Sequence, residues 1–529
     1  MSSRFLARTV AATALALLGS APALVAQVPR SFDVLIRHGR VLDGSGNPWV
    51  RTDIGIRGDR IVAMGDLADA TATTVIAADS LYVAPGFIDT HSHAGETLER
   101  AAMSGAQQLL AQGLTTVFVN PDGGGPVDLA AQRTALEKNG VGVNVAQMIS
   151  HGSVRGAVLG MADRAPTPDE LKKMEALVQK GFDDGAFGLS SGPFYAPGSY
   201  SKTDELVDLS RIAAKYHAPY QSHIRDESDY TVGLLAAVEE VITVAREAHT
   251  RGIVTHIKAL GPNVWGFSAA IVQRIDRARA EGVEVFADQY PYEASSTSLA
   301  AALVPRWAQA GGTAAYKARV ADPAQHARIV TEMRENLARR GGAARIQVAS
   351  YGPDRTLDGE TLAQIASARN ADPVETALAL LDKGGVSIVS FNMLDEDINR
   401  LMQQPWTMTS SDGALIAFGS GMPHPRGNGA FSRKIRKYVV ADHVVELPAA
   451  IRSMTSLPAT VFNLPDRGVL RPGAFADVVV FDLAKVYDRA TYENPHQMAE
   501  GMVDVLVNGK FAVRDGKFTA AHDGRVLRR

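Results

Sequence analysis

The sequence of 529 residues contains no cysteine. This absence excludes disulfide bonds, thiolate metal ligands and lipid attachment through cysteine. An excess of one charge is also lacking, because 54 Lys and Arg residues nearly balance 57 Asp and Glu residues and leave a formal net charge of −3. Neither nucleic acid nor a membrane surface is therefore indicated as a partner. We expect a small-molecule substrate and make no prediction of the oligomeric state.

A hydrophobic run long enough to span a membrane is missing as well. Arg4 and Arg8 precede the apolar run Val10 to Leu18, which small residues follow up to Ala26. The run is short for a transmembrane helix, but the layout is that of a secretory signal peptide. We expect residues 1–26 to be a signal peptide cleaved after Ala23 or Ala26. The predicted location is then outside the cytoplasm, in the periplasm of a bacterium, without a stable membrane anchor.

Alternating strand patterns around Gly-containing turns occur near both ends of the chain, at residues 32–37, 53–65, 476–482 and 503–510. We expect residues 30–84 and 468–529 to form one small β-sandwich. The remaining residues, 85–467, are enough for a barrel-sized domain.

Apolar segments alternate with helical stretches through this middle part, which favours an α/β fold with a parallel sheet wrapped by helices. Eight segments are candidate strands, and a (β/α)8 barrel is the predicted architecture. A ninth apolar run, 386–391, does not fit that count and must be an extra strand or a wrong assignment. The eight candidates are 87–88, 116–119, 143–149, 187–189, 219–222, 253–255, 283–287 and 408–410.

Polar side chains follow these strands at the point where each one ends. His91 and His93 come after the first strand, and their i, i+2 spacing places both imidazoles on one face. The carboxyl ends of barrel strands are where such enzymes carry their chemistry. The other strand-end residues are Asp122, His151, His223, His256, Asp288 and Asp412.

Six of these side chains form a candidate metal site. Imidazole nitrogens suit Zn²⁺ and carboxylates can terminate or bridge a site, so one or two zinc ions are predicted. Such an ion lowers the pKa of a bound water to about 7. Asp412, at the last strand end, is then placed to take a proton from water and pass it to a leaving group. The predicted ligands are His91, His93, Asp122, His223, His256 and Asp412.

The segment Gly86 to His93, read as GFIDTHSH, and the later Ser411-Asp412-Gly413 resemble the amidohydrolase superfamily. More narrowly, the chain resembles the D-aminoacylase (N-acyl-D-amino-acid deacylase) family. The segments that match this family are residues 185–192, 195–198, 223–227, 256–258, 290–295 and 424–429. The resemblance extends from about residue 32 to 516.

This resemblance implies a barrel with a β-sandwich, an extra strand, and an insertion after the seventh strand, here about 297–345, which we interpret as a lid. It also implies that His91 and His93 hold the first metal, that His223 and His256 hold the second, and that Asp412 is the catalytic acid-base. The chain departs from the family at Asp122, where cysteine is usual. Aspartate can replace the thiolate or bridge two metals, or the change can mean a weaker or single-metal site.

The substrate contacts are predicted from side-chain chemistry and from the resemblance. Arg426 can bind a carboxylate bidentately, and Lys258 lies on the same strand face as His256. The resemblance adds Tyr195, Tyr290 and Ser296, and His151 completes the predicted substrate-binding set. Related ring-opening enzymes carry a carboxylated lysine at the fourth strand end. Leu189-Ser190-Ser191 occupies that place here, which disfavours cyclic substrates.

We therefore predict a metal-dependent hydrolase that cleaves the amide of N-acyl amino acids of D configuration. One alternative is a dipeptidase acting on D residues, or another hydrolase of carboxylate-bearing amides. A second alternative, from a different class, is a non-catalytic periplasmic binding protein on the same scaffold. The acyl group and the amino-acid side chain are not predicted.

Overall fold

Strands from the two ends of the chain pair in one sheet of nine strands. The computed structural model describes residues 30–529, so the predicted signal peptide lies outside the described residues. The strand order is β21-β20-β19-β18-β5-β1-β2-β3, with β4 also paired to β1. The strands are β1 (Ser31–Val41), β2 (Val50–Arg57), β3 (Arg60–Gly65), β4 (Thr71–Ala77), β5 (Tyr82–Pro85), β18 (Val478–Phe481), β19 (Met502–Val507), β20 (Lys510–Arg514) and β21 (Lys517–Phe518).

The apolar run of β18 is explained by the two faces of this sheet. Val478 and Val480 pack into a core built with the N-terminal strands, whereas Val479 and Phe481 pack into the core shared with the barrel. Successive side chains of a strand point to opposite faces, so a strand covered on both faces is apolar throughout. The last residues leave the sheet, since Val526 forms a bridge with Val145 of the barrel.

Eight parallel strands form the middle part of the molecule, if β8 and β9 are counted as one strand interrupted at Met148. They occur in the orders β6-β7-β8 and β9-β10-β11-β12-β13-β17. A bridge from Ser92 to Gly413 joins the first strand to the segment after the last. Each of the eight predicted segments overlaps one of these strands. The strands are β6 (Phe87–Ser92), β7 (Leu114–Val119), β8 (Asn144–Gln147), β9 (Ile149–Ser150), β10 (Leu189–Ser191), β11 (Tyr220–Ser222), β12 (Gly252–Val254), β13 (Val285–Gln289) and β17 (Thr407–Thr409).

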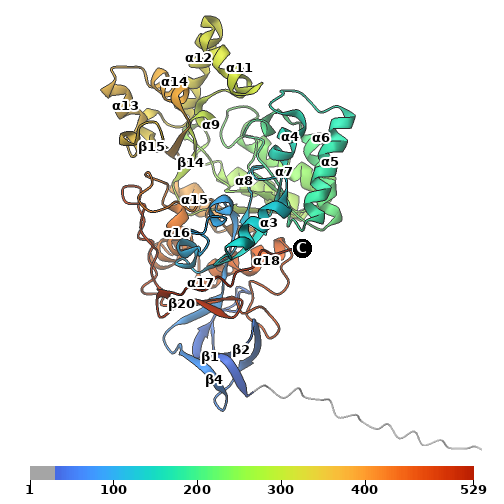
Figure 1. The fold of residues 1–529 in the computed structure, drawn as a ribbon, viewed down its shortest axis with the longest axis vertical. Helices are drawn as coiled ribbons and strands as arrows, with labels where there is room; N and C mark the ends of the chain where they lie inside the picture. The colour runs from blue at the N-terminus through green and yellow to red at the C-terminus, as the bar shows by residue number, and fades with distance from the viewer. Residues whose placement is uncertain (1–29) are drawn as a thin grey trace, which may run out of the picture.

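Helices between these strands cover the parallel sheet from outside (Figure 1). Their ends follow sequence signals: Thr167 caps α5 in a capping box with Glu170, and Pro168 occupies the first turn. The helices are α1 (Gly95–Leu98), α2 (Gln107–Leu110), α3 (Leu129–Lys138), α4 (His151–Leu159), α5 (Pro168–Asp183), α6 (Thr203–Lys215), α7 (Leu234–Ala248), α8 (Ser268–Ala280), α15 (Asp395–Met402), α16 (Arg426–Arg433), α17 (Leu447–Met454) and α18 (Ser456–Val461). None of the helices in residues 30–529 has the length and apolarity needed to cross a membrane.

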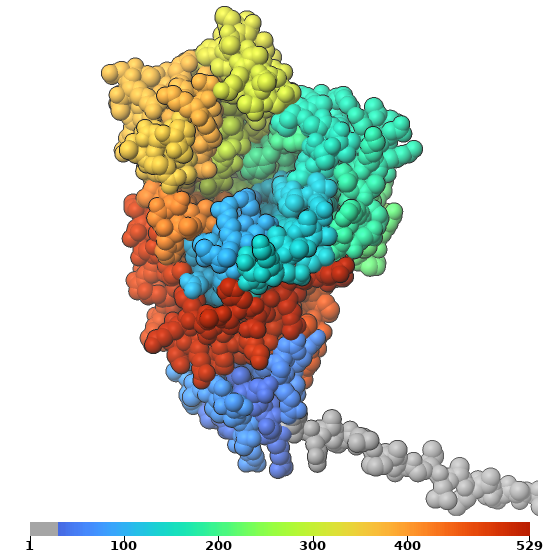
Figure 2. Space-filling model, in the orientation of Figure 1, coloured from blue at the N-terminus to red at the C-terminus, as the bar shows by residue number. Residues whose placement is uncertain are grey.

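Between β13 and β17 the chain forms a separate lobe, which we call the insertion (residues 294–391). It has its own apolar core, which includes Ile329, Met333 and Ile388. Figures 1 and 2 show this lobe in yellow and orange at the end of the molecule opposite the blue N-terminal strands. Its elements are the antiparallel strands β14 (Ala294–Ser298), β15 (Ile346–Tyr351) and β16 (Val386–Phe391), and helices α9 (Leu299–Leu303), α10 (Arg306–Gln309), α11 (Gly312–Ala321), α12 (Pro323–Arg339), α13 (Leu362–Ala368) and α14 (Pro373–Lys383).

The insertion is longer than the predicted 297–345, and the ninth apolar run belongs to it. Residues 386–391 form β16, the central strand of the three-stranded sheet. A central strand packed on a core is apolar in the same way as a barrel strand, so hydrophobicity alone could not separate the two.

Candidate active site

The ends of β6 and β17 are fastened together by one buried carboxylate. Asp89 Oδ1 accepts hydrogen bonds from the backbone N–H of His91 at 3.1 Å and of Ser411 at 2.9 Å. The backbone N–H of Asp412 donates to the carbonyl of His91 at 2.9 Å. Burial raises the pKa of Asp89 to about 6, although these hydrogen bonds favour its ionised form. Asp89 thus places His91 beside Asp412.

Three of the predicted functional residues have a left-handed backbone. Their φ angles are +56° for Asp122, +35° for His256 and +49° for Asp412. Non-glycine residues adopt this conformation rarely and at an energetic cost, and such residues cluster at functional sites. The backbone N–H of His256 also donates to Asp288 Oδ1 at 2.9 Å, which fixes the turn after β12. Asp288 therefore holds the backbone of His256 in place.

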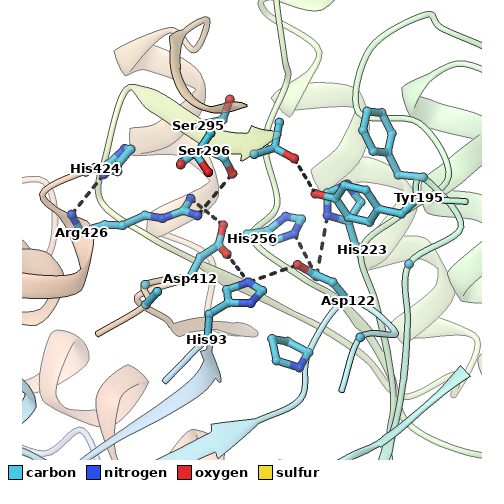
Figure 3. A pocket seen from close by; sticks show the side chains of 18 of the residues that line it. His93, Asp122, Tyr195, His223, His256, Ser295, Ser296, Asp412, His424 and Arg426 are labelled. Atoms are coloured by element: carbon cyan, nitrogen blue, oxygen red, sulfur yellow. Dashed lines mark hydrogen bonds and ion pairs between the residues drawn. The ribbon is translucent and has the colours of Figure 1, made fainter. Parts of the chain in front are cut away.

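The strand-end side chains converge on Asp122 (Figure 3). Asp122 Oδ1 lies 3.2 Å from His91 Nε2, 3.7 Å from His223 Nδ1 and 3.4 Å from His256 Nε2. Its other oxygen, Oδ2, lies 3.3 Å from His93 Nε2. Two groups result, one of His91, His93, Asp122 and Asp412 and one of Asp122, His223 and His256, each with ligand atoms within 4.8 Å of one another. Asp122 belongs to both groups, as a bridging carboxylate would.

Several of these ligand atoms are buried without a hydrogen-bond partner in the described residues. They are both ring nitrogens of His91, both ring nitrogens of His223 and Oδ1 of Asp122. Buried polar atoms are almost always paired, so this concentration of unpaired nitrogen and oxygen atoms is typical of a metal-binding site. Nitrogen and oxygen donors without sulfur fit Zn²⁺. The residues present therefore suit the predicted metal.

The pKa values point in the same direction. Burial would lower the pKa of His93, but hydrogen bonds to Asp122 and Asp412 raise it to about 9. Burial lowers the pKa of His223 to about 3, so this imidazole is neutral and free to donate a lone pair. The carboxyl of Asp122 is buried, yet the surrounding histidines hold its pKa well below its usual range. The carboxylates of the site thus attract positive charge, which a divalent ion can supply.

Asp412 lies between the metal-ligand cluster and a buried arginine. Its Oδ1 is 3.1 Å from His93 Nε2, and its Oδ2 accepts from Arg426 Nη1 at 2.7 Å. Despite burial, the Arg426 guanidinium beside it holds the pKa of Asp412 well below its usual range. His424 orients this arginine, since its Nδ1 accepts from the backbone N–H of Arg426 and its Nε2 donates to the carbonyl of Ala294 at 2.9 Å. Sequence reasoning gave His424 no role.

Lys258 has a partner that the sequence analysis also missed. Its ammonium forms a buried ion pair with Glu227 and lies 2.7 Å from His256 Nδ1. Glu227 Oε1 is in turn 3.1 Å from His256 Nδ1. The only available signal was the position of this glutamate four residues after His223. Glu227 and Lys258 therefore hold the ring of His256, a predicted metal ligand, as well as lining the cavity.

One cavity of about 880 Å³ is lined by His93, Asp122, His223, Glu227, His256, Lys258, Asp412, His424 and Arg426, whereas Asp89, His91 and Asp288 are not part of its lining. Tyr195, Tyr290 and Ser296 also line it, as expected of substrate contacts. The hydroxyl of Tyr195 lies 3.3 Å from Thr297 Oγ1, and the hydroxyl of the buried Tyr290 has no hydrogen-bond partner in the described residues. The backbone carbonyl of Ser296 accepts from Arg426 at 3.4 Å.

His151 does not line this cavity in the structure, contrary to the prediction. The third strand ends at Ser150 and α4 begins at His151 itself. The Nε2 atom of its fully buried ring forms a hydrogen bond with Glu205 of α6 at 2.8 Å, and Arg155 forms an ion pair with the same glutamate. His151 therefore contacts α6 and does not take part in the cavity lining.

Comparison with known proteins agrees with this geometry. The amidohydrolase family model matches residues 74–513. The chain belongs to the amidohydrolase family. Within this family it is 36% identical to the N-acyl-D-glutamate deacylase of Alcaligenes xylosoxydans xylosoxydans, over 94% of this chain and 96% of that protein. This level of similarity also confirms the D-aminoacylase branch that the motifs predicted.

Two solved structures share the fold over nearly the whole chain. One is the N-acyl-D-glutamate deacylase of Bordetella bronchiseptica with zinc and a phosphonate inhibitor that mimics the tetrahedral intermediate; it is 33% identical, with a TM-score of 0.80. The other is a D-aminoacylase with a binuclear metal centre, 30% identical, with a TM-score of 0.79. Each alignment covers 94% of this chain and 100% of the other. The predicted fold, a barrel joined to a β-sandwich, is thereby confirmed.

Proposed function

We propose that this chain is a zinc-dependent deacylase that hydrolyses the amide bond of N-acyl-D-amino acids. One observation carries the proposal: a shared aspartate, four histidines and a base held by arginine meet at one end of the barrel strands, and all of them except His91 line a single cavity. The D configuration rests on the relatives, whose names specify D-amino-acid substrates. The chemistry rests on the residues of this chain.

His91, His93, Asp122 and Asp412 would hold one ion, and Asp122, His223 and His256 would hold a second. A bound zinc ion supplies Lewis acidity, which polarises the acyl carbonyl and lowers the pKa of a coordinated water. The aspartate in place of the family's usual cysteine retains a ligand atom at the point between the two groups. The site can therefore accept one ion or two.

Asp412 acts as the base and then as the acid. Its lowered pKa keeps it ionised at neutral pH, so it can accept a proton from the attacking water. The proton must then pass to the leaving amine. An incoming substrate carboxylate that also binds Arg426 shares the charge of the guanidinium, and this sharing raises the pKa of Asp412 toward the range of a useful proton donor.

Arg426 and Lys258 fix the α-carboxylate of the substrate from two sides of the cavity. Tyr195 and Tyr290 serve as neutral hydrogen-bond donors, because burial raises the pKa of both hydroxyls above their usual value. Ser296 completes this set. These contacts orient the amide toward the metal-ligand cluster, and orientation alone can contribute several orders of magnitude in rate.

We also propose export to the periplasm, which rests on the sequence of residues 1–26, and the division of the chain into a sandwich (30–84 with 468–529) and a barrel (85–467). The mature protein would then meet its substrate outside the cytoplasm. No partner other than the small-molecule substrate is part of the proposal.

The decisive experiment is a stereochemically paired panel of N-acetyl-D- and N-acetyl-L-amino acids, assayed for release of the free amine with the zinc-loaded protein. We expect turnover of D substrates and little turnover of their L enantiomers. Removal of the metal by a chelator should abolish turnover, and added zinc should restore it. Ligand binding without any turnover across the panel would instead support a binding protein.

A further inference from the structure

A buried arginine from the insertion lines the active-site cavity without a carboxylate partner. Arg340 follows the last residue of α12 and is 1% exposed. Its Nε has no hydrogen-bond partner, and no carboxylate oxygen of residues 30–529 lies within 4.0 Å of its guanidinium. An arginine cannot lose its proton to escape this environment, because its pKa lies above 12. A permanent buried charge of this kind requires a counter-charge.

The two other cations of the cavity are already neutralised. Lys258 pairs with Glu227, and Arg426 pairs with Asp412 at 2.7 Å. Lys258, Arg340 and Arg426 are the lysine and arginine residues that line the described cavity. Arg340 alone among these three has no carboxylate partner within residues 30–529.

The wall around Arg340 is polar and held in place. With its amide oriented by the hydrogen-bond network, Asn392 accepts from Arg340 Nη1 at 3.2 Å and from Ser295 Oγ at 3.1 Å. The carbonyl of Asn392 accepts from the backbone N–H of Gly261 at 2.7 Å and from the indole of Trp265 at 3.1 Å. Asn392, the residue that follows the insertion, thereby connects Arg340 to the loop after β12, so the guanidinium is positioned before any ligand binds.

Gly261 allows the end of α12 to lie close to the loop after β12. A Cβ at this position would lie 1.9 Å from the carbonyl oxygen of Arg339, and the φ angle of +91° also favours glycine. The end of α12 therefore packs directly against the backbone of the barrel loop. The remaining lining on the insertion side includes the hydroxyl-bearing Ser350 and Ser387, which suit a polar anionic group.

We propose that Arg340 is a specificity-determining residue that binds a second carboxylate of the substrate, carried by the amino-acid side chain. The preferred substrates are then N-acyl-D-amino acids with an acidic side chain. This inference rests on the proposed function. The α-carboxylate goes to Arg426 and Lys258, whereas the side-chain carboxylate extends toward the insertion.

The test compares N-acetyl-D-glutamate with N-acetyl-D-glutamine, which differ in charge but hardly in shape. We expect the wild-type protein to favour the glutamate derivative in kcat/KM. Arg340→Gln should lower kcat/KM for that substrate about 10- to 100-fold, the usual range for a hydrogen bond to a charged group, and leave the glutamine derivative within about threefold. Arg340→Lys, which keeps the charge without the bidentate geometry, should lie between the two.

Arg339→Gln is the matched control, because Arg339 is the last residue of α12, directly before Arg340, but pairs with Asp229 outside the cavity lining. It should leave the selectivity unchanged. Thermal unfolding of each variant shows whether the fold is retained. Equal losses on both substrates, or a wild-type protein that hydrolyses both equally well, would overturn the role of Arg340. A wild-type protein that hydrolyses neither derivative nor any other N-acyl amino acid would instead refute the proposed function.

Discussion

Two parts of the active-site cavity differ in how their buried positive charges are paired. We call the part formed by the barrel strand ends the floor and the part formed by the insertion the wall. On the floor, at the barrel strand ends, each lysine or arginine is paired: Arg426 with Asp412 and Lys258 with Glu227. On the wall, Arg340 has no such partner among the described residues. The charges of Arg426 and Lys258 on the floor are balanced before the substrate binds, whereas in our proposal the charge of Arg340 on the wall is balanced by the substrate. Catalysis and selectivity are thus assigned to different parts of the fold.

The largest effect on catalysis is expected when Asp412, the proposed base on the floor, is replaced. We expect Asp412→Asn to lower kcat by about 10²- to 10⁴-fold, because the amide cannot accept the proton of the attacking water. Metal content, measured by atomic emission, and the thermal unfolding midpoint should change far less. Asp208→Asn on α6, an aspartate paired with Arg211 at the surface, is the control and should retain activity. Unchanged turnover in Asp412→Asn would show that Asp412 is not the catalytic base.

A somewhat smaller effect is expected at the shared ligand. Asp122→Ala should bind zinc at least about 10- to 100-fold more weakly, since even supporting residues of metal sites cost this much when removed. Asp122→Cys restores the ligand usual in the family and should recover most of the metal. Metal retained after mild dialysis against a chelator measures both. Equal retention in the alanine variant would show that Asp122 is not a ligand.

A third test concerns the protonation state of Lys434, another buried basic residue that lacks a carboxylate partner. Lys434 is 2% exposed and its ammonium nitrogen contacts Thr409 Oγ1 at 2.7 Å and Ser453 Oγ at 2.8 Å. Burial lowers its pKa to about 7 from the value near 10.4 of an unfolded chain. A lysine can therefore lose its proton where Arg340 cannot.

The sign of the pH dependence follows from this shift. Between pH 7 and pH 10 the unfolded chain holds a proton on Lys434 that the folded chain does not, so folding stability rises with pH. Relative to Lys434→Met, the free energy of unfolding of the wild type should increase by at most about 1.4 kcal/mol per pH unit over this window. Denaturant unfolding of both proteins at pH 7, 8 and 9 measures the difference. If the difference in unfolding free energy between the two proteins does not change with pH, Lys434 stays protonated in the folded chain.

The smallest effect concerns the insertion as a lid. Hydrogen exchange within residues 297–345 should slow a few-fold when Asp412→Asn is saturated with N-acetyl-D-glutamate, because a ligand on Arg340 restrains the end of α12. Exchange in β1 to β3, far from the cavity, provides the internal reference. If hydrogen exchange in residues 297–345 does not change at saturating N-acetyl-D-glutamate, the insertion does not take part in substrate binding.

Much of the floor could be predicted from the sequence because it is local. The i, i+2 spacing of His91 and His93 on one strand needs no tertiary information, and polar residues at successive strand ends must meet in a parallel barrel. His151 shows the limit of this rule. The strand extends one residue beyond the predicted 143–149, to Ser150, and helix α4 begins at once with His151. The His151 side chain therefore belongs to a helix and contacts Glu205.

Sequence by itself thus determined the family, the order of strands and the polar residues that meet at the strand ends, because strand periodicity and strand-end chemistry are properties of short segments. Only the tertiary structure decided which charges are neutralised. Glu227 finds Lys258 from a neighbouring strand end, and His424 positions Arg426 through the carbonyl of Ala294 in the insertion. Arg340 reaches the cavity from about 80 residues beyond Lys258 in the chain, through packing of α12 on Gly261. Pairing between distant charges depends on which segments pack together, and no local pattern in the sequence encodes it.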